Sequence, residues 1–295
     1  MVKFNWKKLG IATGLSLGLL LAGCSSDGGE DKADTIGKGQ EVELAYVEWD
    51  SEIASTHVIG KVLEDLGYDV SITPLDNAVM WKSVATGDAD AMVSAWLPAT
   101  HQAQFAEYGD QMIDLGPNLE GAKIGMVVPA YMDVNSIEDL SDEAGKTITG
   151  IEAGAGVVQA TERALEEYPN LGDWKLETSS SGAMATALGQ AYEKEEEIIV
   201  TGWSPHWKFN KYDLKYLEDP KGVYGGEETI NTMVREGLEE DMPELYQILD
   251  NFYWSMEDME EVMVMIQDGE SPEDAAAKWV EENEDKVAEW TEGIK

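Results

Sequence analysis

The sequence predicts an α/β fold made of two similar lobes with a cleft between them. Apolar runs of strand length alternate with helical segments, which is typical of parallel sheets with crossover helices. This β-α-β-α-β order occurs twice, over residues 42–96 and 146–203. Each copy ends on an apolar run that is followed by a Trp, one residue and a Pro, in "AWLP" and "GWSP". Ligands of such sheets bind beyond the carboxyl ends of the strands, so we expect the cleft at these tryptophans.

The first copy begins with a buried strand, "VELAYVEW", which leads into a helix over residues 50–67. We expect Asp50 or Ser51 to cap this helix, because its apolar residues recur at helical spacing from there until Gly67 ends it. His57 is expected on the surface of the helix. The rest of the copy is a strand over 68–75, a helix over 78–87 and a strand over 90–96.

The second copy is preceded by a strand over residues 122–132 and by Ser136 and Asp139, which resemble a capping box. Its strands and helices are expected at 146–152, 157–168, 174–180, 182–194 and 196–203.

The remainder of the chain, from "TINTMVREGL" at residue 229 onward, is expected to be mostly helical. Ser255 with Asp258 opens one helix that Gly269 ends, and Ser271–Pro272 opens another. An apolar stripe in the first of these helices is interpreted as core packing: Met259, Val262, Met263 and Ile266.

The N-terminus predicts export. "MVKFNWKKLG" carries three lysines and no acid, and the apolar stretch that follows has signal-peptide length. It ends in "LAGC", which resembles a bacterial lipobox, so residues 1–24 are expected to be a lipoprotein signal peptide with lipidation at Cys24. The alternative is an ordinary secretory signal with an incidental Cys. Cys24 is the only Cys of the chain, and the polar, Gly-rich residues 25–40 are expected to form a flexible linker.

The charge balance limits the partners. A formal net charge of −39 argues against binding of nucleic acid and of anionic lipid. The acidic residues could form a solvated surface that keeps the protein soluble in concentrated salt, or an acidic binding face. Because they are spread along the whole chain, we favour the salt-adapted, halophilic surface.

Catalytic motifs are missing from the sequence. It contains neither G-x-S-x-G nor H-E-x-x-H nor an EF-hand pattern, and only three histidines, so we expect no metal site, no cofactor and no enzyme activity. "GAGVVQ" at 154–159 lacks the third Gly of a dinucleotide fingerprint. It does place backbone N–H groups at a helix N-terminus, where a phosphate or carboxylate binds favourably. A tight strand-to-helix turn that needs Gly explains the motif equally well.

Three tryptophans occupy predicted strand ends: Trp49, Trp96 and Trp203. If they meet in one cleft, they suit a quaternary ammonium, whose charge is spread over methyl groups and which aromatic faces attract. Each such cation–π contact contributes roughly 0.5–2 kcal/mol. For any single Trp the alternative is core packing, which we assign to the remaining candidates: Trp81, Trp174, Trp207, Trp254, Trp279 and Trp290.

The motifs "AYVEWDSEIAS", "SAWLPATH", "GAGVV" and "TGWSPHW" resemble those of glycine betaine/proline betaine-binding proteins of ABC importers, in order from about residue 41 to 291. The resemblance implies a two-lobed periplasmic-binding-protein fold of type II with the ligand cleft between the lobes. Lobe I is expected at 41–127, with 232–295 packing back on it, and lobe II at 128–231. The implied protein is a monomeric lipoprotein on the outer face of the cell membrane, which captures glycine betaine for osmoprotectant uptake and delivers it to an ABC permease.

The resemblance also implies the binding residues. The aromatic cage for the cation would be Trp49, Trp96 and Trp203. The carboxylate would meet the backbone N–H groups of Gly156 and Val157 and the side chain of His101. His206 is expected to support the turn at Trp203. Relatives often carry Gly-Ser-Gly where this chain has "GAG" at 154–156, so a hydroxyl contact from the middle position is absent.

Two rival functions stay open from the sequence. The first is a receptor for choline or carnitine, of which choline has no carboxylate and would not need His101. The second is an exported enzyme that acts on quaternary amines. It would need a general base near the cage, for which Glu48, Asp50 and His101 are the candidates.

Overall fold

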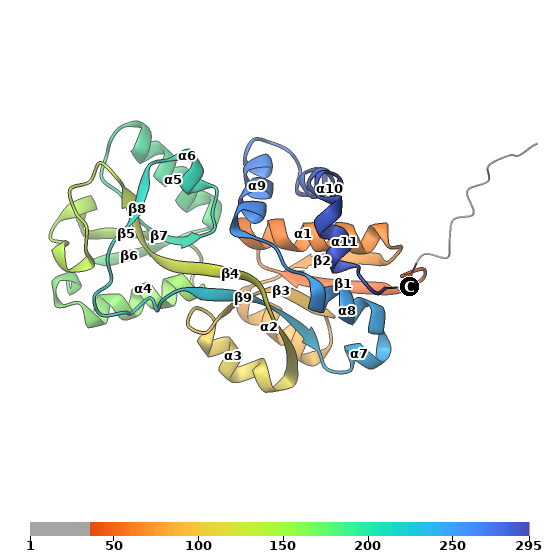
Figure 1. Cartoon of the computed structure of the whole chain (residues 1–295). Coiled ribbons are helices and arrows are strands. Elements are labelled where there is room, and N and C mark those ends of the chain that lie inside the picture. The colour runs from red at the N-terminus through yellow and green to blue at the C-terminus, as the bar shows by residue number, and fades with distance from the viewer. Residues whose placement is uncertain (1–35, 295) are drawn as a thin grey trace, which may run out of the picture. The chain divides into compact units, whose positions relative to one another are not determined.

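The computed structural model describes residues 36–294, so the predicted signal peptide, Cys24 and most of the linker lie outside the described residues. The described residues form one compact unit. The centre of this unit is a nine-stranded sheet in the order β2-β1-β3-β9-β4-β7-β5-β6, with β8 paired to β4 (Figure 1).

The first half of the sheet has the predicted β-α-β-α-β order, with β1 parallel to both β2 and β3. Its elements are β1 Glu41–Tyr46, α1 Asp50–Asp65, β2 Asp69–Pro74, α2 Asn77–Thr86 and β3 Ala91–Leu97. The second half repeats this order, with β5 parallel to both β6 and β7. Its elements are β5 Thr147–Gly150, α4 Gly156–Glu167, β6 Lys175–Thr178, α5 Ser181–Glu193 and β7 Ile199–Ser204.

Two long strands lie in the middle of the sheet, β4 Met112–Pro129 and β9 Glu228–Arg235. Residues 112–122 of β4 pair antiparallel with β9, and residues 123–127 pair antiparallel with β7. The last residues of β4 pair with β8 Leu214–Tyr216. In Figure 1 both β4 and β9 run between the two groups of elements. Strand β4 therefore belongs to both halves and connects them.

The C-terminal helices belong to the first half, because α9 and α10 pack against α1. They are α7 Leu238–Asp241, α8 Pro243–Asn251, α9 Met256–Gln267, α10 Pro272–Glu282 and α11 Glu284–Trp290. Ser255 and Asp258 form the predicted capping box of α9, and Ser271 caps α10. The remaining helices are α3 Gln102–Tyr108, α6 Lys208–Lys211 and the 3₁₀ helices η1 Gly109–Gln111, η2 Ile137–Asp139, η3 Glu143–Lys146 and η4 Pro169–Leu171.

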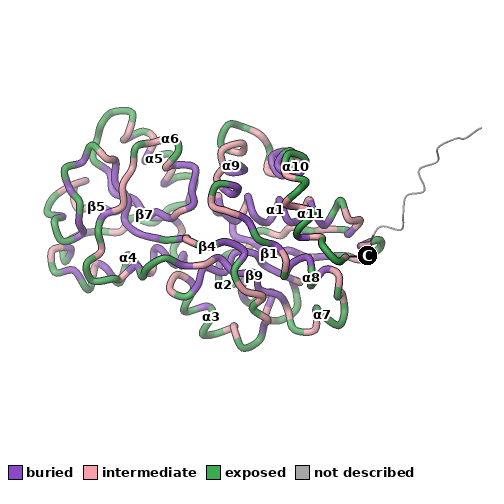
Figure 2. Tube along the Cα trace, in the orientation of Figure 1, coloured by how far each residue is buried: buried purple, intermediate pink, exposed green. Residues whose placement is uncertain are grey.

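Buried residues follow the sheet through both halves, whereas the outer faces of the helices are exposed (Figure 2). The tryptophans assigned to packing are all buried, and three of them form one aromatic cluster with Phe252: Trp254, Trp279 and Trp290. In the stripe of α9, Met259, Val262 and Met263 are buried and Ile266 is half-buried, which confirms core packing.

Two details of the predicted secondary structure are wrong. The chain from residue 229 onward is mostly helical, as expected, but residues 229–235 belong to strand β9, which lies between β3 and β4 and is buried on both faces. Ser136 caps only the short helix η2 and accepts from the N–H of Glu138 rather than that of Asp139.

Two expectations about α1 are also wrong. Trp49 occupies the N-cap position, and neither Asp50 nor Ser51 caps the helix, because Asp50 is bonded to the second half of the sheet. His57 is buried instead of exposed. Its Nδ1 lies 2.8 Å from the carbonyl oxygen of Ile53, and its ring meets Tyr46 edge-on.

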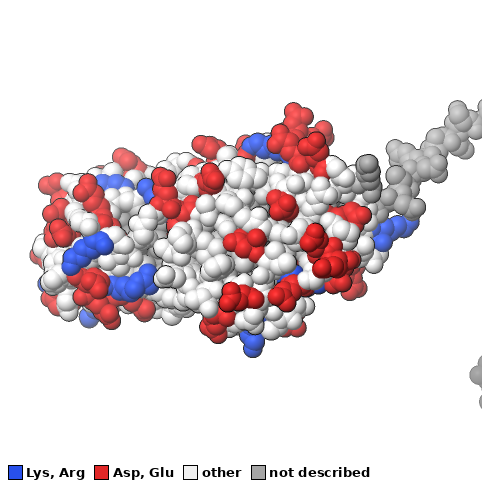
Figure 3. Space-filling view, turned by 60° about the horizontal axis from the view of Figure 1, so that its bottom comes forward, with Lys and Arg blue, Asp and Glu red and all other residues white. Residues whose placement is uncertain are grey.

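On the face shown in Figure 3, acidic side chains form several separated groups, with fewer lysines and arginines between them. Among residues 36–294, no helix has both the length and the apolar character that a membrane crossing requires. The lobe limits at residues 127 and 231 stay a prediction.

Candidate functional site

The three tryptophans predicted for the cage come together at one end of the strands. Trp96 lies in β3, Trp203 lies in β7, and Trp49 follows β1 directly before α1. Each is almost completely buried. The peptide bonds Leu97–Pro98 and Ser204–Pro205 are both cis.

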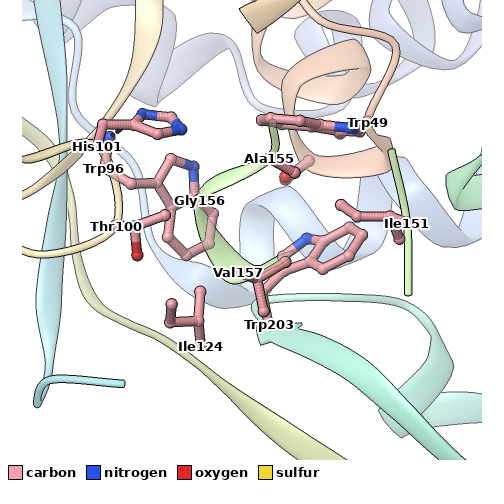
Figure 4. Close-up of a pocket in the computed structure, with 11 residues that line it drawn as sticks. Trp49, Trp96, Thr100, His101, Ile124, Ile151, Ala155, Gly156, Val157 and Trp203 are labelled. Atoms are coloured by element: carbon pink, nitrogen blue, oxygen red, sulfur yellow. Dashed lines mark hydrogen bonds between the residues drawn. The ribbon is translucent and has the colours of Figure 1, made fainter. Parts of the chain in front are cut away.

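These tryptophans line a cavity with about 320 Å³ of space between its lining atoms. In Figure 4 the three indoles stand on three sides of the cavity. All six predicted binding residues are among those that line it: Trp49, Trp96, His101, Gly156, Val157 and Trp203. The others are Ser51, Thr100, Ile124, Ile151 and Ala155, which the sequence analysis did not identify.

His101 is fully buried in the wall of this cavity. The backbone N–H of Trp96 donates to its Nδ1 at 3.1 Å, so Nδ1 carries no proton. Burial lowers the pKa of His101 to about 3, which keeps the ring neutral near pH 7. The proton is therefore on Nε2, which has no hydrogen-bond partner. Because His101 lines the cavity, this N–H is available to a ligand bound there.

Helix α4 points its N-terminus at the same cavity. Gly156 and Val157 are its first two residues, and their N–H groups have no acceptor inside the helix. A Cβ on Gly156 would lie 2.3 Å from the carbonyl oxygen of Thr100, so only Gly allows this close approach. The "GAG" turn therefore needs its last Gly for packing, and it also presents N–H groups to the cavity.

A hydrogen bond and a ring contact fix the indole of Trp49 at the cavity. The Nε1–H of Trp49 donates to Glu152 at 3.0 Å, and the same carboxylate accepts from the N–H of Ser181. His101 stacks against Trp49, with 6.2 Å between the ring centroids. Glu152 and Ser181 belong to the second half of the sheet, so Trp49 is held from both sides of the cavity.

Asp50, next to Trp49, is also bonded to the second half of the sheet, but here the first half supplies the acceptor. Its Oδ1 accepts from the Nε1–H of Trp207 at 2.7 Å, and its Oδ2 accepts from the Ser181 hydroxyl at 3.1 Å. The Nε2 of His206 lies 3.5 Å from the same Oδ2. Burial by itself would raise the pKa of Asp50, but the donors His206, Trp207 and Ser181 outweigh it and hold the pKa well below the usual range.

Trp203 has polar neighbours of its own. His206 packs edge-on against its indole at 4.6 Å, as expected for support of the turn. The Nζ of Lys208 lies 4.2 Å from the centre of the indole, although Lys208 is fully buried and its Nζ has no hydrogen-bond partner. Burial lowers the pKa of Lys208 to about 7, and the charge of Asp50 only partly opposes this.

The cavity lining has no charged side chain at neutral pH, since His101 is neutral. Its aromatic faces attract a cation, and the N–H groups of α4 and His101 attract an anion. The arrangement therefore suits a small zwitterion. Within residues 36–294, no group of His, Cys, Asp and Glu side chains is placed to hold a metal ion.

The chain is 54% identical over 159 residues to a curated relative, the glycine betaine/carnitine transport binding protein GbuC of Listeria monocytogenes serotype 1/2a (strain 10403S). This alignment covers 53% of each protein, so the chain matches about half the length of this relative.

Solved structures of higher coverage are also similar. Lactococcal OpuAC, in its closed-liganded conformation complexed with glycine betaine, gives a TM-score of 0.84 at 56% identity, covering 86% of this chain and 100% of that one. An ABC-transporter choline binding protein in complex with choline gives a TM-score of 0.80 at 28% identity, covering 89% of this chain and 94% of that one. These structures confirm the predicted type II periplasmic-binding-protein fold. Residues 40–282 match the model of the substrate binding domain of ABC-type glycine betaine transport systems, and the chain belongs to this family.

Proposed function

We propose that this protein is the extracytoplasmic substrate-binding component of an ABC importer and captures glycine betaine, and also proline betaine, for osmoprotectant uptake. One observation carries the proposal. A single uncharged cavity joins three indoles to a helix N-terminus and to the free Nε2–H of His101. The family and the glycine betaine complex of lactococcal OpuAC support the same ligand.

The indoles of Trp49, Trp96 and Trp203 would hold the trimethylammonium group. This cation cannot donate hydrogen bonds, so it loses little when aromatic faces replace its water. Three contacts of roughly 0.5–2 kcal/mol each would contribute about 1.5–6 kcal/mol before ordering costs. The remaining affinity needed for micromolar binding, about 8 kcal/mol in total, would come from burial and from the carboxylate.

The carboxylate would accept from the N–H groups of Gly156 and Val157 and from the Nε2–H of His101. All three donors are at the cavity, and the helix N-terminus adds its partial positive charge. The neutral state of His101 fits this role, because a ligand with no net charge needs no counter-ion. The acidic surface does not oppose binding, since a zwitterion has little monopole to repel.

We further propose that the predicted lobes close over the ligand, and that the loaded protein delivers it to the permease. Export, the lipid anchor on Cys24 and the monomeric state are proposed from the N-terminal motif and the family resemblance. The salt-adapted surface is proposed from the net charge of −39 and from the scattered acidic groups of Figure 3.

The candidate bases of the rival enzyme are poorly suited to catalysis, which supports a receptor. Glu48 is exposed and does not line the cavity. The carboxylate of Asp50 is occupied by hydrogen bonds and has a lowered pKa. His101, with a pKa of about 3, is a weak base near pH 7.

Calorimetric titration of the chain from residue 25, in high salt, tests the proposal with glycine betaine, proline betaine, choline and carnitine. Binding of the two betaines at micromolar concentration, with much weaker binding of choline, is the expected result. The choline complex of a 28% identical protein makes choline the alternative ligand. Choline binding without betaine binding would contradict the proposed carboxylate site and support only the cation cage. If NMR after incubation shows that glycine betaine or choline is converted to another product, the protein is an enzyme and not a receptor.

A further inference from the structure

Glu228 is a buried carboxylate that lies outside the cavity lining. It is the first residue of β9 and is only 3% exposed. Its Oε1 accepts from the N–H groups of Ala99 at 2.6 Å and of Thr100 at 2.8 Å, and its Oε2 accepts from the Thr100 hydroxyl. Among the described residues, no Lys, Arg or His forms an ion pair with it. Burial of an unpaired carboxylate is costly, so these hydrogen bonds must offset the loss of water.

The loop held by Glu228 forms one wall of the cavity. Thr100 and His101 both line it. The carbonyl oxygen of Thr100 touches Gly156 at the start of α4, at the position that a Cβ would occupy. The N–H of His101 donates to the carbonyl oxygen of Trp96 at 3.0 Å, which makes the loop a closed turn. The position of Thr100 therefore sets the distance between His101 and the helix N-terminus.

Glu228 also lies at the point where strand β4 changes its pairing partner from β9 to β7. It pairs with Ala122 of β4, the last β4 residue that pairs with β9. The next residue of β4, Lys123, pairs with Ser204 of β7 in the second half. The carboxylate thus ties the cavity loop to the strands that connect the halves.

We propose that Glu228 is a positioning residue that aligns His101 with the N-terminus of α4 and thereby determines selectivity for ligands that carry a carboxylate. Glu228 touches no ligand itself. This inference rests on the proposed function, because it concerns the carboxylate site of the same cavity. It predicts that the cation cage works without Glu228, since Trp49 and Trp203 are held by other contacts and Trp96 is held in β3 by its pairing with Ile230 of β9.

The test compares variants of the full chain with two ligands, glycine betaine and tetramethylammonium, which has the cation alone. In Glu228→Ala, we expect the affinity for glycine betaine to fall at least tenfold and that for tetramethylammonium to change less than threefold. Glu228→Gln should recover most of the loss, because its amide oxygen can accept both N–H groups and its NH₂ can donate to Thr100. Thr100→Val removes only the hydroxyl contact and should weaken glycine betaine two- to fivefold.

A second readout is the imidazole N–H resonance of His101 in the protein saturated with glycine betaine, which is assignable because the chain has three histidines. It should be sharp in the wild type and Glu228→Gln, and broadened in Glu228→Ala. Asp90→Asn is the control, since Asp90 pairs with Arg235 and does not line the cavity. It should lower the unfolding temperature without changing either affinity.

Three results would overturn the inference: an unchanged glycine betaine affinity in Glu228→Ala, equal weakening of both ligands, or a His101 signal as sharp as in the wild type. The wild type separates this inference from the proposed function. If it does not bind glycine betaine, the proposed function fails; if it binds but the variants behave alike, only the role of Glu228 fails.

Discussion

Trp207 donates its indole N–H to Oδ1 of Asp50 at 2.7 Å, and this hydrogen bond joins the two halves of the sheet next to the cavity. Asp50 begins α1 in the first half, whereas Trp207 follows β7 in the second. The Ser181 hydroxyl, also from the second half, donates to the other oxygen of the same carboxylate. In an importer receptor that closes over its ligand, such contacts would form on closure and add to the apparent affinity.

Asp50→Asn should weaken glycine betaine binding about five- to thirtyfold, or about 1–2 kcal/mol, because charge-assisted hydrogen bonds become neutral or lose their acceptor. Calorimetric titration measures the change. Ser181→Ala is the milder comparison, since it removes one donor and leaves the bond to Trp207 intact; a two- to threefold loss is expected. A dissociation constant for Asp50→Asn within twofold of the wild type would show that this contact does not contribute to binding.

Binding should be nearly independent of pH between 5 and 9 as far as His101 and Asp50 are concerned. The pKa of His101 is lowered to about 3, so the ring stays neutral and keeps its Nε2–H throughout this range. The pKa of Asp50 is lowered as well, so its stabilising contacts are complete above the ordinary carboxyl pKa and are lost only as pH falls through the lower folded value.

Titration with glycine betaine at pH 5, 7 and 9 measures this profile. His101→Gln, which retains an N–H donor near the position of Nε2, should bind more tightly than His101→Ala. Affinity that falls steadily as pH rises above 6 would mean instead that a protonated His101 holds the carboxylate.

Trp203→Ala should cost roughly 1–3 kcal/mol of binding free energy, because a cation–π contact and apolar burial are lost together. Trp203→Phe keeps an aromatic face and should lose less. Trp174→Phe is the control, since Trp174 is buried away from the cavity lining. Equal affinities of the wild type and Trp203→Ala for glycine betaine would remove Trp203 from the cage.

Because Lys208 is buried, we expect it to make the free energy of unfolding, rather than ligand binding, depend on pH. Burial lowers its pKa to about 7 in the folded state, while the unfolded chain keeps the ordinary value near 10.4. Between these values the unfolded state binds more protons, so this group makes stability rise with pH from about 7 toward 10. Below pH 7 the buried ammonium is charged and its full cost is present.

Lys208→Met should therefore stabilise the fold at pH 6 by about 1–3 kcal/mol, as measured by chemical denaturation. The gain should shrink as pH approaches 10, where the buried amine is neutral in the folded wild type. A variant that is less stable than the wild type at pH 6 would show that the contact with Trp203 outweighs the desolvation of the ammonium.

The repeated strand–helix order was predictable because each unit carries local signals. Apolar runs and a Gly after α2 mark boundaries in these units within a few residues, and serines do the same for α9 and α10 in the C-terminal segment. Strand β9 was not predictable in this way. It is buried on both faces between β3 and β4, so its side chains do not alternate in polarity, and alternation is the main sign of a strand.

The first part of β4 was missed for a different reason. "DLGPNLEG" at 114–121 contains Gly116 and Gly121 with positive φ and a Pro, which together indicate a turn. The strand accommodates them through shifts in its register against β9. His57 was misplaced because helix α10, more than 200 positions away in the sequence, packs over α1.

The candidate site was predictable where its residues lie in motifs. The cavity brings together Trp49, Trp96 and Trp203 with the His101 and "GAG" elements, as the resemblance implied. Thr100 lies in the same "SAWLPATH" motif and could have been included. Glu228 could not, because it acts through a loop 128 positions away and no local pattern links the two. The tautomer of His101 likewise depends on a backbone N–H that only the folded loop supplies.

A crystal structure of the protein with glycine betaine would test the central claim most directly. The account predicts the quaternary nitrogen within about 6 Å of the ring centres of Trp49, Trp96 and Trp203. It predicts the carboxylate within hydrogen-bonding distance of the N–H groups of Gly156 and Val157 and of Nε2 of His101. A ligand bound in the reverse orientation, with its carboxylate among the indoles, or bound outside this cavity, would contradict it.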